Sequence, residues 1–109
     1  MMARKKLKAV HPGDILLHEF MEPLQLSTDK LAKELGVSVP TVNEIVRRQR
    51  AVTAETALRL ARYFGTSAQL WQKLQSQYDL EMARQKIGNT IERTISPLPR
   101  PDLTGAREQ

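Results

Sequence analysis

The stretch Ser27–Arg50, STDKLAKELGVSVPTVNEIVRRQR, is the part of the chain from which the fold can be worked out. Leu31, Ala32 and Leu35 are spaced so that they fall on one face of a short helix. Ala32 is small, which lets a second helix cross closely at that point. Gly36 follows this face, and a glycine there ends a helix and can take the positive φ of a tight turn. The stretch therefore begins with a short helix and a sharp turn.

A second helix begins at Ser38, whose hydroxyl can serve as the N-cap. Pro40 fits its first turn, where a missing N–H costs little. Four apolar residues then recur at helical spacing and provide a face that packs on the first helix: Val39, Val42, Ile45 and Val46. Two helices joined in this way resemble the helix-turn-helix of the phage-repressor type, whose second helix lies in the DNA major groove. A plain helical hairpin could share the pattern.

The composition is that of one small domain. The chain has 109 residues, of which 40% are hydrophobic. A core of this size is modest, so oligomerisation would help stability. No apolar run reaches transmembrane length and the N-terminus lacks a long apolar region, so we expect neither a membrane span nor a secretory signal. The absence of Cys excludes disulfides, Cys–zinc sites and thiol catalysis, and it fits a cytoplasmic protein.

The formal net charge is +5, and the cations gather in two places. Residues 1–10 carry no acid and contain Arg4, Lys5, Lys6 and Lys8. The second cluster ends the second helix of the pair and contains Arg47, Arg48 and Arg50. Basic clusters favour phosphate, and binding through them weakens with salt. Solubility is the alternative explanation for the first cluster, whereas the adjacent helix pair favours phosphate contact for the second.

A turn at residues 11–14 leads into the first helix, with Asp14 as the candidate N-cap. The apolar face of this helix comprises Ile15, Leu16, Phe20 and Leu24. Pro23 ends or bends it near Glu22. We expect Leu24 and Leu26, which connect it to the central pair, to lie in the core.

The segment His18–Glu22 has part of a zinc-protease pattern, but Glu22 stands where the second His is needed. His11 is the only other His, and no third ligand is obvious. A surface His beside two acids explains the segment better. No Gly-rich phosphate loop and no nucleophilic arrangement of Ser and His is visible, so we expect no metal, no cofactor, no catalytic residue and no enzyme.

Two further helices follow the central pair. Thr53 caps the first, over residues 54–64, which Gly65 ends. Ser67 caps the second, from about residue 68 to 86. Its core stripe contains Leu70, Trp71, Leu74 and Tyr78. This helix is longer than a small core needs, so its far end, residues 80–87, is a candidate dimer or partner contact.

The pattern breaks at Gly88 and Asn89. Residues 90–95 could form a short strand or a loose extension, and the Pro-rich residues 96–109 favour an extended tail, either disordered or ordered on a partner. These readings predict an all-α, lambda-repressor-like domain of five helices with a helix-turn-helix over residues 11–86. A flexible basic arm, residues 1–10, precedes it, and a C-terminal extension, residues 87–109, follows.

Three further motifs make the resemblance more specific. They are the opening HPGDIL with a later EPL, the block TAETALRLARYFGTS, and the ending WQKLQSQYDL. With them, His11–Ala83 resembles the HigA-type (VapI-like) antitoxins of bacterial toxin–antitoxin modules. Many members of that family stop near Lys86, so the extension departs from the pattern.

The resemblance implies two activities and no catalysis. Such an antitoxin binds double-stranded operator DNA, an inverted repeat in its own promoter, as a homodimer and represses transcription. It also binds and neutralises a HigB-type, RelE-like mRNA endonuclease toxin. A stand-alone repressor without a toxin partner is the alternative. A protein-interaction module that no longer contacts DNA is a third possibility, against which Ser38, Thr41 and the three arginines argue.

The resemblance also implies which residues contact DNA. Bases or flanking phosphates would be faced by Ser38, Val39, Pro40, Thr41 and Glu44, and a phosphate by Thr28. The side chains themselves suggest roles: Thr41 and Asn43 can donate hydrogen bonds, Val39 can meet a thymine methyl group, and Glu44 can accept from cytosine N4. The backbone would be held by Arg47, Arg48 and Arg50. Pro40 offers no polar group, which favours recognition of DNA shape.

Overall fold

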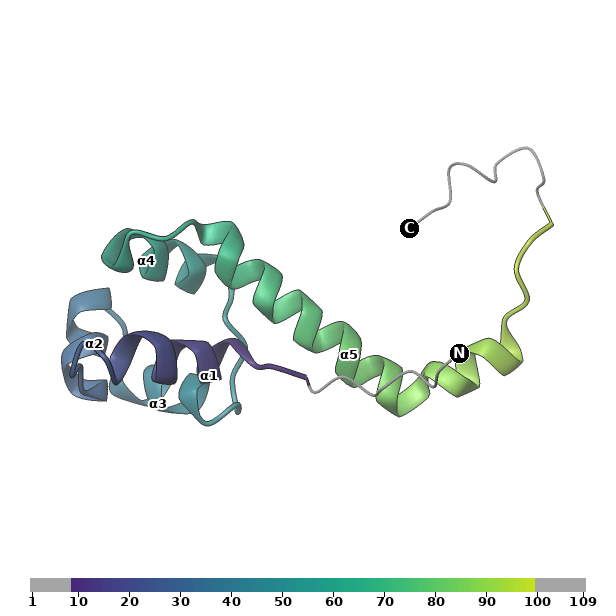
Figure 1. Cartoon of the computed structure of the whole chain (residues 1–109), viewed down its shortest axis with the longest axis horizontal. Coiled ribbons are helices and arrows are strands. Elements are labelled where there is room, and N and C mark those ends of the chain that lie inside the picture. Colours follow the sequence, from purple (N-terminus) through teal and green to yellow (C-terminus); the bar gives the residue numbers. More distant parts are fainter. Residues whose placement is uncertain (1–8, 100–109) are drawn as a thin grey trace.

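The computed structural model describes residues 9–99, which form five helices (Figure 1). They are α1 (Pro12–Ile15) running directly into η1 (Leu16–Met21), α2 (Thr28–Leu35), α3 (Val39–Val46), α4 (Ala54–Phe64) and α5 (Ala68–Thr94). Helices α1 to α4 gather around the beginning of α5, which then runs out of the cluster (Figure 1). The predicted all-α class is confirmed for the described residues.

The core lies where the helix pair, α1 and α4 meet the first turns of α5. Its buried apolar residues are Leu16, Met21, Leu31, Ala32, Leu35, Val42, Ile45, Val52, Ala57, Leu60 and Trp71. Trp71 is fully buried, and its indole Nε1 donates to Thr66 Oγ1 at 2.8 Å. Phe20 lies against it, with ring centroids 5.3 Å apart. The predicted faces of the central pair are therefore the faces that are buried.

Side-chain caps begin four of the helices. The hydroxyl oxygens of Ser27, Ser38, Thr53 and Ser67 accept backbone N–H groups at the starts of α2, α3, α4 and α5. Each such cap is worth about 1 kcal/mol. Gly36 and Gly65 end α2 and α4 with φ of 73° and 76°, which a side chain would disfavour. The predicted caps and stops of these helices are confirmed.

The first helix differs from the prediction at its start, because its N-cap is His11 and not Asp14. His11 Nδ1 accepts the Gly13 N–H at 2.8 Å. Pro12 occupies the first helical position, where it fits well, and it keeps the preceding residue extended. The cap therefore falls one residue before the proline, and Asp14 lies inside the first turn.

The end of this helix also differs. Residues 16–21 form a wider turn in which the Glu22 N–H donates to Leu17 O, five residues back, at 2.9 Å. The helix then stops before Pro23, as predicted. Leu24 lies in the following turn with 57% of its surface exposed, so its expected burial is wrong, while Leu26 does pack against the core.

Helix α5 does not end near Lys86 but continues to Thr94. Gly88 lies inside it, and the strand or loose extension expected at residues 90–95 is wrong. One glycine costs a helix only about 1 kcal/mol relative to alanine, which a helix already propagating can absorb. The predicted boundary at residues 86 and 87 thus falls within a continuous helix. Most of the predicted arm, and the tail beyond residue 99, lie outside the described residues.

Candidate nucleic-acid interface

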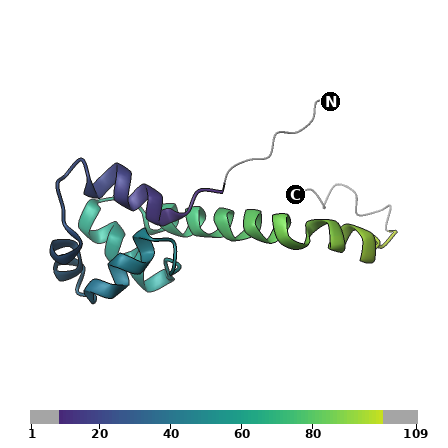
Figure 2. The same cartoon turned by 90° about the horizontal axis from the view of Figure 1, so that it is seen from below.

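The helix pair α2–α3 lies at the opposite end of the molecule from the free end of α5 (Figure 2). Its turn is closed by backbone hydrogen bonds from Gly36 N to Lys33 O at 3.2 Å and from Val37 N to Ala32 O at 3.0 Å. The left-handed Gly36 between them reverses the chain. This is the predicted helix–turn–helix geometry, and it leaves the outer face of α3 in solvent.

None of the ten predicted DNA-contact residues is buried. Four of the eight on α3 and in the segment after it are fully exposed side chains on the helix, namely Ser38 as its cap, Pro40, Asn43 and the C-cap Arg47. At the start of α3, Ser38 Oγ and Thr41 Oγ1 are 2.8 Å apart, and Ser38 Oγ also accepts the Thr41 N–H. The Thr41 hydroxyl is thus held in place at the helix N-terminus, where helix dipoles favour an anion such as phosphate.

Glu44 and Arg50 form an ion pair, with 2.7 Å between Arg50 Nη2 and Glu44 Oε1. The pair ties the chain after α3 back to the helix. Glu44 therefore accepts from a cytosine only if this arginine lets it go, and the arginine keeps other donors for a phosphate. The two residues act together, which their separate roles in the sequence interpretation did not anticipate.

Arg48 is paired as well, and its partner comes from α1. Its Nε donates to Asp14 Oδ1 at 3.0 Å, and its backbone is left-handed with φ of 64°. Close to it, a Cβ added to Gly13 would lie only 1.9 Å from Ile45 O, so the backbones of α1 and α3 touch. Sequence reasoning missed this contact, although the Gly–Asp of the HPGDIL opening is the motif that makes it.

His11 connects the same place to α5. It is 2% exposed, and its ring meets Tyr78 edge-on with centroids 4.8 Å apart. Burial lowers the pKa of His11 below its ordinary value, and Asp14 partly opposes that effect. The neutral ring accepts through Nδ1, so its proton is on Nε2. Helix α1 is therefore a wedge between the recognition helix and α5.

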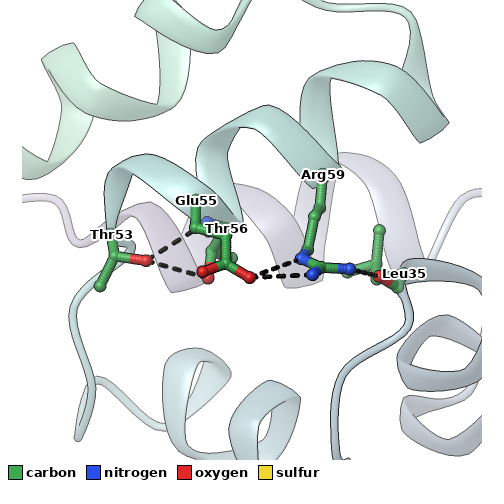
Figure 3. A network of polar contacts seen from close by, with 5 residues as sticks. All are labelled: Leu35, Thr53, Glu55, Thr56 and Arg59. Carbon is green, nitrogen blue, oxygen red and sulfur yellow. Dashed lines mark hydrogen bonds and ion pairs between the residues drawn. The ribbon is translucent and has the colours of Figure 1, made fainter.

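The far end of α2 is fixed by α4 (Figure 3). Arg59 Nη1 donates to Leu35 O at 2.8 Å, and Arg59 Nη2 lies 2.8 Å from Glu55 Oε2. The last carbonyls of a helix have no partner within the helix, so a guanidinium there satisfies one of them. Sequence reasoning placed Arg59 only on the outer side of its helix.

The incomplete zinc-protease pattern gives a surface pair, with His18 Nδ1 3.0 Å from Glu22 Oε1. Over residues 9–99, no grouping of three or more His, Asp or Glu residues could hold a metal ion. In the same part of the chain, no helix has the length and apolar character needed to cross a membrane.

The fold and this interface are those of a helix-turn-helix protein, and the sequence pattern of the helix-turn-helix family matches residues 17–71. Virulence-associated protein I of Dichelobacter nodosus is 54% identical over 75% of this chain and 76% of its own length. Antitoxin HigA-1 of Vibrio cholerae is 32% identical over 72% of this chain and 74% of its own.

A solved structure of the antitoxin HigA of Pseudomonas aeruginosa with the higBA promoter superposes with a TM-score of 0.83. It is 50% identical, and the match covers 84% of this chain and all of that one. The chain therefore belongs to the HigA-type antitoxins of the helix-turn-helix family, which is a family of DNA-binding regulators and not of enzymes.

Proposed function

We propose that this protein is the antitoxin of a type II toxin–antitoxin module that represses its own operon and neutralises a HigB-type, RelE-like mRNA endonuclease. The observation that carries the proposal is the exposed α3 behind a glycine turn in a chain 50% identical to a HigA antitoxin solved with its promoter. It works in the cytoplasm, where operator and toxin are found, and has no catalytic task of its own.

Two groups of residues divide the work on DNA. Sequence is read by the start of α3, through Ser38, Val39, Pro40, Thr41, Asn43 and Glu44. The sugar–phosphate backbone is held by Thr28, Arg47, Arg48 and Arg50. Because Pro40 offers no hydrogen bond and Glu44 is paired with Arg50, few direct base contacts remain, so DNA shape contributes to specificity.

One helix pair spans only a few base pairs, so two copies are needed for a specific site. A homodimer binds an inverted repeat whose half-sites lie about one helical turn apart. A monomer bound to an asymmetric site at micromolar concentration contradicts this part of the proposal.

Fluorescence anisotropy on a fragment of the protein's own promoter and on random DNA tests the reading role of α3. Thr41→Ala weakens operator binding by about 10-fold, equivalent to one lost base contact, and random-DNA binding much less. Arg48→Ala weakens both, and so does Arg47→Ala, the arginine that has no ion pair within residues 9–99. Equal losses on both DNAs for all three variants contradict the division of roles.

Co-expression with the small open reading frame next to its gene tests the toxin. A complex that co-purifies and relieves growth arrest supports the antitoxin role. Tight operator binding without such a complex leaves a stand-alone repressor.

A further inference from the structure

The second half of α5 is a helix without packing. Its buried residues, Trp71 and Gln75, lie in its first turns, and no residue from Asp79 to Thr94 is buried. Figures 1 and 2 both show this half extending away from the other helices. An isolated helix of this length is marginal in water, so it needs a surface to pack on.

One face of this half is apolar. Leu80, Ile87 and Ile91 are 55%, 44% and 43% exposed, and with Ile95 they recur at steps of seven, four and four residues. That spacing keeps them on one side of the helix. The face runs without a break into a groove of about 460 Å³ at the root of α5, lined by Val10, Leu74, Tyr78 and Leu80 among others. An apolar stripe and an apolar groove thus lie along one line.

The charges beside the stripe are arranged in two blocks of opposite sign. Asp79 and Glu81 are followed by Arg84 and Lys86. Two copies of the helix packed in parallel would bring like charges together. Packed antiparallel, with the crossing between residues 82 and 83, they bring Asp79 level with Lys86 of the second copy, and Glu81 level with Arg84 of the second copy.

Helical geometry makes both pairings feasible. Asp79 and Lys86 are seven residues apart, which is close to two full turns, so they share one flank of the stripe. Glu81 and Arg84 share the other flank, and within one copy they already lie 3.6 Å apart. A two-fold axis across the helix keeps each flank facing its counterpart and makes every pair twice.

We propose that the apolar stripe of α5 is covered by the same stripe of a second copy, antiparallel. In this register Ile87 lies level with Tyr78 of the second copy, and Ile91 lies level with Leu74 of the second copy. Both of those residues line the groove, so the distal helix of each copy fills the groove of the other. The inference rests on the proposed homodimer and names the surface that forms it.

Sedimentation equilibrium without DNA tests the surface. The double variant Ile87→Asp with Ile91→Asp weakens the dimer by at least about 100-fold, since two apolar anchors become charged. Met82→Asp is the matched control, because Met82 is 42% exposed and points away from the stripe. Trp71 fluorescence during thermal unfolding reports that the core remains folded. A wild-type monomer, or a double variant that dimerises like the wild type, overturns the proposal.

Charge reversal tests the pairing. Glu81→Arg weakens the dimer, and adding Arg84→Glu restores it, because the pairs are rebuilt with opposite sign. A dimer indifferent to Glu81→Arg overturns the pairing. Since the chain has no Cys, single cysteines then give the direction. Ala83→Cys cross-links under oxidation, whereas Ile95→Cys does not. Cross-linking at both positions identifies a parallel pair and overturns the antiparallel arrangement.

These measurements fail independently of the proposed function. A stable dimer with the expected variant behaviour but no operator binding contradicts repression and leaves the surface intact. A monomer that binds its operator contradicts the surface and leaves DNA binding intact.

Discussion

The two ends of the molecule are held together by different means. At the α2–α3 end, side chains from other helices fix each piece: Arg59 of α4 holds the end of α2, and Asp14 of α1 holds the segment after α3. In the distal half of α5, the polar contacts stay within the helix, such as Gln85 to Glu81 and Thr94 to Thr90. The first end is therefore complete within one chain, whereas the second is organised for something outside it.

The sharpest way to break this comparison is to add one methyl group at each end. Gly13→Ala places a Cβ 1.9 Å from Ile45 O and forces α1 away from α3, so we expect a loss of about 3 kcal/mol in the free energy of unfolding. At Gly88 the nearest atom to an added Cβ is 3.8 Å away. Gly88→Ala is therefore expected to gain about 1 kcal/mol.

Urea denaturation followed by Trp71 fluorescence gives both values. Opposite signs for the two variants support the contrast between the ends. A loss at Gly88 as large as that at Gly13 would show that the distal helix is packed as tightly as the core.

The next effect concerns the contact between α4 and α2. Arg59→Ala removes the donor to Leu35 O, and we expect a loss of about 1 kcal/mol in the free energy of unfolding, reduced because the side chain is partly exposed. Arg62→Ala on the same helix is the control, with an effect near zero. The same denaturation experiment measures both, and equal losses would contradict a specific role for the Leu35 carbonyl.

The contrast between the ends also explains what could be predicted from the sequence. The core of the central pair followed from local spacing, and the caps at Ser38, Thr53 and Ser67 followed from residue type. These signals act within one helix or one turn. The end of α5 could not be predicted in the same way, because glycine and threonine disfavour a helix only weakly and a continuing helix outweighs them.

The candidate interface was predictable only in part. The exposure of Asn43 and Arg47 followed from the helical period. The ion pairs of Arg48 and Arg50 did not, because Asp14 lies on a helix far away in the sequence, and Glu44 faces its partner only once the chain has turned. Pairing across the fold decides which cations are available to phosphate.

A smaller effect separates positioning from charge at the DNA. Asp14→Ala removes an acid near the proposed interface, which by charge alone strengthens DNA binding. If Asp14 instead positions Arg48 and the segment after α3, operator affinity falls by about 3-fold. Asp29→Ala, in the exposed first turn of α2, is the control and is expected to bind equally well or more tightly. Anisotropy across a salt series measures both, and tighter binding by the Asp14 variant would reject the positioning role.

The smallest effect is a pH dependence at the wedge between the two ends. Burial lowers the pKa of His11, so between that lowered value and the ordinary 6.5 the unfolded chain binds more protons than the folded one. Stability therefore falls as the pH drops below 6.5, because protonation of Nδ1 also removes the acceptor for the Gly13 N–H. His11→Asn keeps an N-cap oxygen without a titrating ring and should flatten this dependence. His18→Asn, at the exposed histidine, should not. Thermal unfolding from pH 7.5 to 5.5 makes the comparison, and parallel curves for the wild type and the His11 variant would show that the wedge does not respond to pH.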